Sequence, residues 1–376
     1  MLENNSNFAQ YLLNELWRAY IEARKGKRKT VDEHKFEIND MMNMLQLRDD
    51  ILNRSYRPSR SVAFIIHDPV TREIFAASFR DRIVHHFLYH ICGEWWDKRL
   101  IADSYSCRVG KGTLYGQQRL AKHIRQVSEN YTKPVFVAKL DIQGYFMSLK
   151  RERLFERIEW GLDRQFAGNK GQLYRTVRFL WKEIIFDDPV RGVIIRGKRS
   201  DWNTLPHNKS LFYQPDGQGI VIGNLTSQLL SNIYLDQLDR FVTIKLGYKH
   251  YGRYVDDFYI IVTMDEKEQL LRDIVLIEDY LKTLDLTLHP KKRYFQSAEK
   301  GVPFIGTVVY PGYTTPTKRV QNRCRQALKR IAEGNGDMET VTSYMGHLMH
   351  MNSKKFFSEL FDEFGWDFDD THYKRF

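Results

Sequence analysis

The chain has little cysteine and no long apolar run, and each shortage excludes a class of protein. Its three cysteines, Cys92, Cys107 and Cys324, match no metal-ligand spacing, and an odd, sparse set argues against a disulfide framework. Apolar runs such as 62–66 stop far short of the ~20 residues that span a bilayer. The amino terminus lacks the basic and then apolar segments of a secretory signal. The sequence therefore predicts a cytoplasmic protein without a membrane segment.

What the chain does have is a core-forming composition and an excess of positive charge. Hydrophobic residues make up 42% and charged residues 28% of its 376 residues, as in a folded globular protein. No internal repeat or low-complexity tract interrupts it, and the length predicts two or three structural units. Lys and Arg number 58 against 47 Asp and Glu, a net charge of +11. This excess favours a polyanionic partner, nucleic acid above all, with a merely basic protein as the alternative.

The apolar periodicity of the first hundred residues predicts three helices and a hairpin. Apolar side chains recur at helical spacing over 8–23 and 36–52, and a third helix is expected over 80–91. Between the second and third helices, 62–66 and 73–77 have the β-branched and aromatic content of short strands. We expect these two strands to pair across a turn.

The middle of the chain alternates strands with helices. Residues 135–141 have the pattern of a strand that ends in a carboxylate, Asp141. Three helices are expected, over 150–160, 173–185 and 229–241. Thr226 or Ser227 would cap the last of them. The stretch 187–219 is rich in Gly, Pro and basic residues with little periodicity, which is typical of a functional segment or an insertion.

Two adjacent aspartates are the sharpest feature of the sequence. Asp256 and Asp257 lie between two apolar runs, 251–255 and 258–262, in the pattern of a tight hairpin turn. An exposed turn is the plain interpretation, because Asp is a common turn former. If they were buried side by side, however, the two carboxylates would repel unless a cation lay between them. Together with Asp141, they supply the oxygen ligands that could hold two divalent cations for nucleotidyl transfer.

Several segments, in the right order, resemble the reverse transcriptases. The first palm motif of that family is similar to 139–146, and its active-site hairpin is similar to 254–257. Further matching segments are 56–84 (fingers), 104–113 (the fingers–palm motif of bacterial and group II intron enzymes), 219–235 (the strand and helix before the hairpin), 286–292 (the later palm motif) and 302–306 (the primer grip). The resemblance implies an α+β right-hand polymerase fold, with fingers, a palm with an antiparallel sheet and a short helical thumb.

On this resemblance the chain divides into three parts. Residues 1–134 would form N-terminal helices and the fingers, and 135–310 the palm, with a finger-side insertion at about 151–216. Residues 311–376 would form the thumb. The side chains expected to bind nucleic acid are Arg108 and Lys111, on template phosphates, and Arg319, Arg323, Lys329 and Arg330 of a thumb helix, on the template–primer duplex. A solvated basic helix is the alternative for the thumb.

The same resemblance assigns roles at the catalytic centre. Asp141 and Asp256 would be the main ligands of two Mg²⁺ ions, with Mn²⁺ as a substitute. Asp257 and the carbonyl of Ile142 would support them. Lys292 would protonate the leaving pyrophosphate, unless it is an ordinary surface lysine.

The residues expected to hold the incoming nucleotide are Arg72, Phe146, Ile222, Gly223 and Gln228. Arg72 would grip the triphosphate with its charge. Phe146 would stack under the sugar and exclude a 2′-hydroxyl, unless it is a core phenylalanine. Ile222 would contact the nascent base pair without the donor and acceptor of a glutamine, unless it simply packs under the fingers.

Two departures from the common pattern indicate a branch of the family. Most cellular reverse transcriptases carry Gln-Gly at the nucleotide pocket and Ser-Pro five residues on, whereas this chain has Ile222-Gly223 and Ser227-Gln228. In this it resembles the reverse transcriptases of diversity-generating retroelements, as it does, less specifically, over 196–202 and 205–211.

That branch implies a bacterial or phage-encoded enzyme that copies a template RNA into adenine-mutagenised cDNA. Its partners would be the RNA, the RNA/DNA duplex, deoxynucleoside triphosphates and a small basic helical accessory variability protein. A group II intron-like or retron-type reverse transcriptase without a mutagenic role is the first alternative. A non-enzymatic RNA-binding module or inactive polymerase is the second, against which the three intact aspartates argue.

Overall fold

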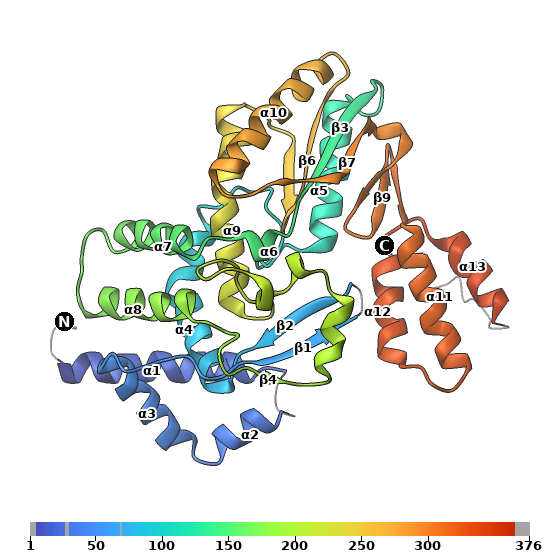
Figure 1. Cartoon of the computed structure of the whole chain (residues 1–376). Coiled ribbons are helices and arrows are strands. Elements are labelled where there is room, and N and C mark those ends of the chain that lie inside the picture. The colour runs from blue at the N-terminus through green and yellow to red at the C-terminus, as the bar shows by residue number, and fades with distance from the viewer. Residues whose placement is uncertain (1–4, 27–29, 68–69, 365–376) are drawn as a thin grey trace. The chain divides into compact units, whose positions relative to one another are not determined.

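The computed structural model of the chain describes residues 5–26, 30–67 and 70–364 (Figure 1). The chain divides into two compact units, each assembled from three separate stretches of sequence. The first contains Met1–Ile101, Ile142–Arg240 and Tyr280–Thr287, and the second contains Ala102–Asp141, Phe241–Asp279 and Leu288–Phe376. Among the described residues, no helix is long and apolar enough to cross a membrane. The boundaries of fingers, palm and thumb stay a prediction.

Helices form most of the first unit. In chain order they are α1 (Asn5–Arg24), α2 (Val31–Glu37), α3 (Asp40–Leu52), α4 (Phe79–Asp97), α6 (Tyr145–Ser148), α7 (Arg151–Gln165), α8 (Gln172–Phe186) and α9 (Leu225–Arg240). Helices α1, α4 and α8 contain the predicted ranges 8–23, 80–91 and 173–185 in full. The single helix predicted over 36–52 is wrong, because Asn39 adopts φ −133° and ψ 45° and so separates α2 from α3.

The start of α9 also differs from the prediction. The helix begins at Leu225, so Thr226 and Ser227 lie inside its first turn and do not cap it. Thr226 is 1% exposed, and its hydroxyl pairs with Nδ1 of His85 at 2.8 Å. A buried partner on α4 therefore takes the hydroxyl that the sequence pattern assigned to a cap.

A small sheet in the first unit confirms the predicted hairpin. Its strands are β1 (Val62–Ile66), β2 (Arg72–Ala76) and β4 (Ile194–Ile195), in the order β2-β1-β4. The first two pair antiparallel, with Val62 opposite Ala76, and β4 adds to β1 in parallel. The third strand comes from the stretch 187–219, so that stretch extends the sheet and is not a free loop.

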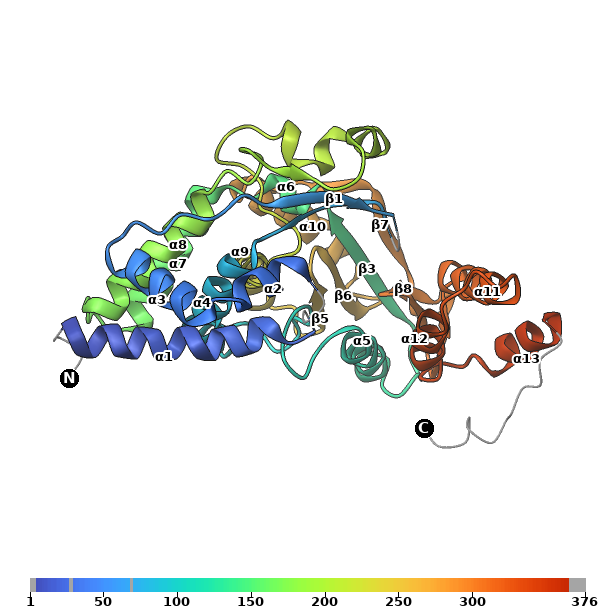
Figure 2. The same ribbon diagram turned by 90° about the horizontal axis from the view of Figure 1, so that it is seen from below.

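A buried glutamate anchors the same stretch. Figure 2 shows 187–219 (yellow-green) lying over β1. Glu73 on β2 is 1% exposed, and its Oε1 accepts hydrogen bonds from Trp202 Nε1 at 2.6 Å and Ser210 Oγ at 2.7 Å. Its Oε2 accepts the backbone N–H of Leu211 at 2.7 Å. A buried carboxylate is tolerated only with such donors, so the anchor fixes the stretch on the sheet.

A four-stranded sheet lies at the centre of the second unit. Its strands are β3 (Val135–Ile142), β5 (Tyr251–Tyr254), β6 (Asp257–Thr263) and β7 (Leu288–Ser297), in the order β5-β6-β3-β7. The strands predicted over 135–141, 251–255 and 258–262 are confirmed to within one residue. Two further helices are α5 (Thr113–Val127), which lies in this unit, and α10 (Lys267–Thr283), which lies in it up to Asp279. Leu120 of α5 shares a core with Tyr259 of β6, which fixes the helix on the sheet.

The C-terminal part of the second unit combines a small sheet with three helices. The strands β8 (Val302–Phe304), β9 (Thr307–Tyr310) and β10 (Tyr313–Pro316) pair in the order β10-β9-β8. They are followed by α11 (Lys318–Ala332), α12 (Met338–Leu348) and α13 (Lys354–Glu363), which Figure 1 shows in orange to red. Cys324, Leu328, Val341 and Phe357 are buried between these helices. One side of α11 therefore packs, while Arg319, Lys329 and Arg330 stay exposed and Arg325 pairs with Glu363 of α13.

A glycine in α7 makes the packing of the first unit testable. A methyl group on Gly161 would overlap Cζ2 of Trp96, which is 1% exposed and packs on Trp95 and Trp160, so the ring cannot retreat. We expect Gly161→Ala to lower the free energy of unfolding by about 1–3 kcal/mol, even though alanine is the better helix former.

The matched control is Gly346→Ala in α12, where nothing lies within 4 Å of the added methyl group. That change should be neutral or stabilising, because alanine gains helix propensity there without a clash. Urea unfolding of the two variants measures the difference. Equal effects would contradict the packing described.

Candidate active site

The strands of the second unit bring the three predicted aspartates together. In the register of β3 against β6, Asp141 lies directly opposite Asp257. Asp256 occupies the turn between β5 and β6, immediately before Asp257. Opposite residues of an antiparallel pair point to the same face, with Cβ atoms ~4.5–5.5 Å apart. Two like charges therefore face each other at the end of the hairpin, and a third adjoins them.

Burial and the neighbouring carboxylates raise the pKa of two of these groups, Asp256 and Asp257. Burial, then the charge of Asp141 and that of Asp257, raise the pKa of Asp256 to about 7. Burial also raises the pKa of Asp257, although Lys139 opposes that shift. The raised pKa values show that the negative charges of the cluster are not fully compensated by neighbouring groups. A cation bound between the carboxylates would relieve their repulsion and is therefore favoured.

Two lysines partly neutralise the cluster. Nζ of Lys139 donates to both carboxylate oxygens of Asp257, at 2.9 and 2.9 Å. Nζ of Lys292 donates to both oxygens of Asp141, at 2.9 and 3.0 Å. The structure therefore brings Lys292 to the cluster as the sequence predicted, and its role as proton donor stays a prediction.

Sequence reasoning missed Lys139, although a signal for it was present. Side chains two residues apart on a strand lie on the same face, so Lys139 must share the face of Asp141. Lys139 lies opposite Tyr259 in the register, and its long side chain reaches diagonally to Asp257, the partner of Asp141. The strand period alone was enough to find it.

The donor set suits a divalent cation, and the residues present fit such an ion. Among the described residues, no group of three or more His, Cys, Asp or Glu side chains has the geometry of an assembled metal site. The fit is instead one of chemistry, because Asp141, Asp256 and Asp257 offer only hard oxygen ligands, whose repulsion the two lysines relieve only in part, and Mg²⁺ prefers such ligands. The carbonyl of Ile142 as a further ligand stays a prediction.

The first unit brings together three of the residues predicted to hold a nucleotide. Phe146 and Ile222 are half-buried against the same apolar cluster. The carbonyl of Ile222 accepts the N–H of Phe75 at 3.2 Å, which ties its segment to β2. Gly223 follows at φ +125°, and a Cβ there would meet the carbonyl oxygen of Phe75 at 3.3 Å. Both the backbone angle and the close approach require glycine at this position.

The core interpretation of Phe146 gains support from this packing, without excluding the sugar contact. Its ring lies 5.3 Å from that of Tyr145, in an edge-on arrangement. Arg72, at the first position of β2, and Gln228, on α9, are exposed. Their predicted contacts with a nucleotide stay predictions.

The residues predicted to bind nucleic acid fall into two groups. Arg108 Nη1 donates to the carbonyl of Ser104 at 3.1 Å, and Lys111 Nζ donates to the carbonyl of Ala102 at 2.5 Å, so both cations stabilise their own loop. On α11, by contrast, Arg319, Lys329 and Arg330 are exposed and Arg323 is half-buried. The basic side of α11 is therefore the better candidate for contact with a duplex.

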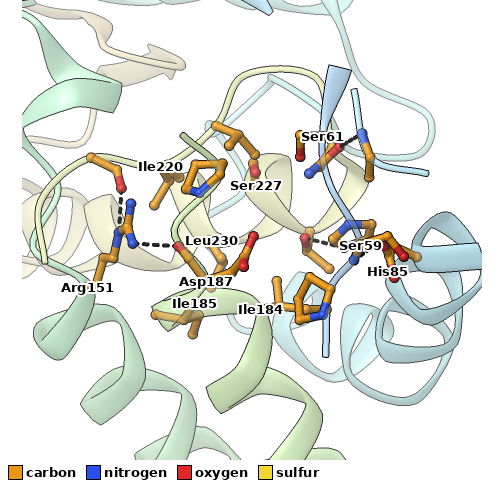
Figure 3. A pocket seen from close by; sticks show the side chains of 18 of the residues that line it. Ser59, Ser61, His85, Arg151, Ile184, Ile185, Asp187, Ile220, Ser227 and Leu230 are labelled. Atoms are coloured by element: carbon orange, nitrogen blue, oxygen red, sulfur yellow. Dashed lines mark hydrogen bonds between the residues drawn. The ribbon is translucent and has the colours of Figure 1, made fainter. Parts of the chain in front are cut away.

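A cavity in the first unit is too small for a nucleotide (Figure 3). It has a volume of about 50 Å³, which is room for a few water molecules. Arg151 closes one side, with Nε donating to the carbonyl of Gly219 at 2.9 Å and Nη1 to that of Asp187 at 2.6 Å. Burial, then the charge of Asp81, raises the pKa of Asp187 to about 6. We assign this cavity to the packing of the helices around it.

The raised pKa of Asp256 predicts how stability depends on pH. Its ordinary value is 3.8 and its value in the folded protein is about 7, so the folded state binds the proton more tightly than the unfolded state. The stability that this proton contributes is present below pH ~4 and is lost as pH rises to ~7. Asp256→Asn carries no such charge. In EDTA, we therefore expect the melting temperature of the variant to rise relative to wild type between pH 5 and pH 8. A constant difference across that range would contradict the shift.

Comparison with known proteins gives the family. Residues 71–309 match the family model described as reverse transcriptase (RNA-dependent DNA polymerase). No curated protein matches the sequence significantly.

Among solved structures, the chain is similar to telomerases of two yeasts. One is telomerase from Candida albicans in complex with a TWJ fragment of telomeric RNA, at 12% identity and a TM-score of 0.49, covering 84% of this chain and 56% of that one. Another is apo telomerase from Candida tropicalis, at 11% identity and a TM-score of 0.47, covering 84% and 61%. The chain thus spans little more than half of those telomerases, and likeness at this level says nothing about its substrates.

The family match is stronger evidence than these structural similarities, because it covers well over half of the chain. The matched residues include β3 with Asp141, the turn with Asp256 and Asp257, and β7 with Lys292. The chain therefore belongs to the reverse transcriptase family and has its right-hand polymerase fold of the α+β class.

Proposed function

We propose that the chain is an RNA-directed DNA polymerase that extends a primer with deoxynucleotides by two-metal nucleotidyl transfer. One observation carries the proposal, the three carboxylates that β3 and the β5–β6 turn place side by side in a chain of this family. A purely structural acidic turn would not need Asp141 opposite Asp257, because like charges directly opposite destabilise a sheet. Carboxylates that repel each other are, however, commonly found side by side at functional sites, where their shifted pKa values serve binding or catalysis.

The residues of the cluster would have different roles in the reaction. Asp141 and Asp256 would hold two Mg²⁺ ions, which when bound activate the primer 3′-hydroxyl and stabilise the leaving pyrophosphate. Lys139 opposes the rise in the pKa of Asp257 that burial causes, because an ammonium group beside a carboxylate favours its charged form. Lys292 is bonded to Asp141 and would lose that partner when a cation takes the carboxylate. Its ammonium group would then be released to donate a proton to the pyrophosphate.

The nucleotide would be selected by residues of the first unit. Phe146 would contact the sugar and reject a 2′-hydroxyl, and Arg72 would bind the triphosphate. Arg319, Arg323, Lys329 and Arg330 on α11 would follow the template–primer duplex. These assignments rest on the family resemblance and on the exposure of Arg72, Arg319, Lys329 and Arg330, whereas Arg323 is half-buried.

We further infer that the enzyme copies the RNA of a diversity-generating retroelement, with errors at adenines. Support comes from Ile222-Gly223 and Ser227-Gln228, where this branch departs from other reverse transcriptases. The inference includes a bacterial or phage origin, a cytoplasmic location and a small basic accessory protein as partner. A group II intron-like or retron-type enzyme would share the chemistry without the errors.

Primer extension on an RNA template tests the polymerase. We expect wild-type protein to add deoxynucleotides in Mg²⁺, and Asp256→Asn to lose at least about a hundredfold in rate, because several kcal/mol of transition-state stabilisation depends on bound metal. Asp265→Asn is the matched control, since Asp265 is exposed in the next turn. A folded Asp256→Asn variant with the rate of the control would refute the assignment.

Replacement of Ile222 tests the mutagenic branch. Glutamine can donate and accept hydrogen bonds near the nascent pair, whereas isoleucine cannot, so a correct pair should gain more over a mismatch. A differential contact of ~1.4 kcal/mol changes discrimination about tenfold. We expect Ile222→Gln to lower misincorporation, most clearly opposite template adenine, while extension persists. Deep sequencing of cDNA made from one RNA by both proteins measures it. An unchanged error spectrum from an active variant would contradict the mutagenic role and favour the group II intron-like or retron-type alternative.

A further inference from the structure

The residue before the catalytic aspartates has an unusual backbone. Val255 adopts φ +56°, in the left-handed region. A β-branched residue is rarely found there, because its Cβ collides with the backbone. Such a conformation persists only where the surroundings hold it, and it recurs at functional sites. The direction of Asp256, the next residue, depends on this angle.

Two side chains hold the backbone of Val255 from both sides. Its N–H donates to Oγ of Ser106 at 3.1 Å. Its carbonyl accepts from Nη1 of Arg253 at 2.8 Å. If the peptide on either side of Val255 rotated toward an ordinary β conformation, one of these bonds would break.

The two side chains are themselves fixed. Arg253 is fully buried, and its Nη2 also donates to Oγ of Ser104 at 3.2 Å. The segment that carries Ser104 and Ser106 pairs in parallel with β5. Arg253 N–H donates to the carbonyl of Asp103 at 2.8 Å, and Tyr105 N–H donates to the carbonyl of Arg253 at 2.9 Å. In the next step of this ladder, the Ser106 hydroxyl accepts the N–H of Val255.

A network of buried and half-buried side chains supports this segment. Arg119 of α5 binds both oxygens of Asp103, at 2.6 and 2.8 Å. The hydroxyl of Tyr105 donates to Asp103 at 3.0 Å and lies 2.8 Å from that of Tyr259 on β6. Contacts with α5 and β6 therefore fix the position of the segment that carries Ser106.

We propose that Ser106 and Arg253 are positioning residues of the polymerase, which hold Val255 left-handed and thereby aim the carboxylate of Asp256. The inference rests on the proposed function and gives the motif 104–113 a second role. Sequence reasoning expected that motif to bind the template through Arg108 and Lys111. Both cations donate to carbonyls of their own loop, which supports the part of the motif that carries Ser106.

The first test compares two buried serines. We expect Ser106→Ala to lower kcat of primer extension on the order of tenfold, with KM for nucleotide and primer–template nearly unchanged, because the turn still folds but samples other directions. Ser106→Thr keeps the hydroxyl and should restore most of the rate. The matched control is Ser128→Ala, since Ser128 is 2% exposed and its Oγ accepts the N–H of Tyr131, another left-handed residue, at 2.9 Å. That variant should lose similar stability and keep its rate.

The second test removes the need for the bond. Glycine adopts positive φ without a Cβ collision, so Val255→Gly should make the turn less dependent on Ser106. In a double-mutant cycle, Ser106→Ala should then cost no more than about twofold in the Val255→Gly background. Equal losses in both backgrounds, or a Ser106→Ala rate equal to that of Ser128→Ala, would overturn the proposal.

A readout without catalysis separates this inference from the proposed function. The rise in melting temperature produced by Mg²⁺ reports the assembled carboxylates directly. We expect this rise to shrink in Ser106→Ala and to persist in Ser128→Ala. If wild-type protein showed the Mg²⁺ response but did not extend a primer, the proposed function would fail while the positioning role stood. An Mg²⁺ response equal in all three proteins would refute the positioning role.

Discussion

Repulsion between carboxylates is the constraint on which the second unit depends. The register of β3 against β6 places Asp141 opposite Asp257, and the turn adds Asp256. Burial and the neighbouring charges raise the pKa of Asp256 to about 7, and Lys139 and Lys292 offset part of the cost by ion pairing. This arrangement lowers the free energy of unfolding of the metal-free protein. A bound cation would raise it again, because ligands that bind only the folded state stabilise it.

Tertiary contacts also hold the backbone in unfavourable conformations at two positions. Val255 lies in the left-handed region between bonds from Ser106 and Arg253. In the first unit, Gly223 fits against the carbonyl of Phe75 only because it has no side chain. Local sequence preferences do not explain these positions, but their surroundings do.

Local patterns predicted the elements, and tertiary partners decided the details. Continuous runs of apolar, β-branched and aromatic residues located β3, β5 and β6 to within one residue, because both faces of these strands are packed. The break at Asn39 was missed because the apolar spacing continues across it. The cap assigned to Thr226 failed because His85, far away in sequence, takes its hydroxyl. No pattern in the sequence revealed that Glu73 would be buried as the anchor of the stretch 187–219.

Direct counting of bound metal tests the central claim, that Asp141, Asp256 and Asp257 together form a divalent-cation site. Electron paramagnetic resonance of free Mn²⁺ counts the ions taken up by the intact chain with primer–template and a deoxynucleotide. The account predicts about two bound Mn²⁺ per chain. It predicts the loss of at least one in Asp256→Asn but not in Asp265→Asn. Equal uptake by wild type and Asp256→Asn would contradict it.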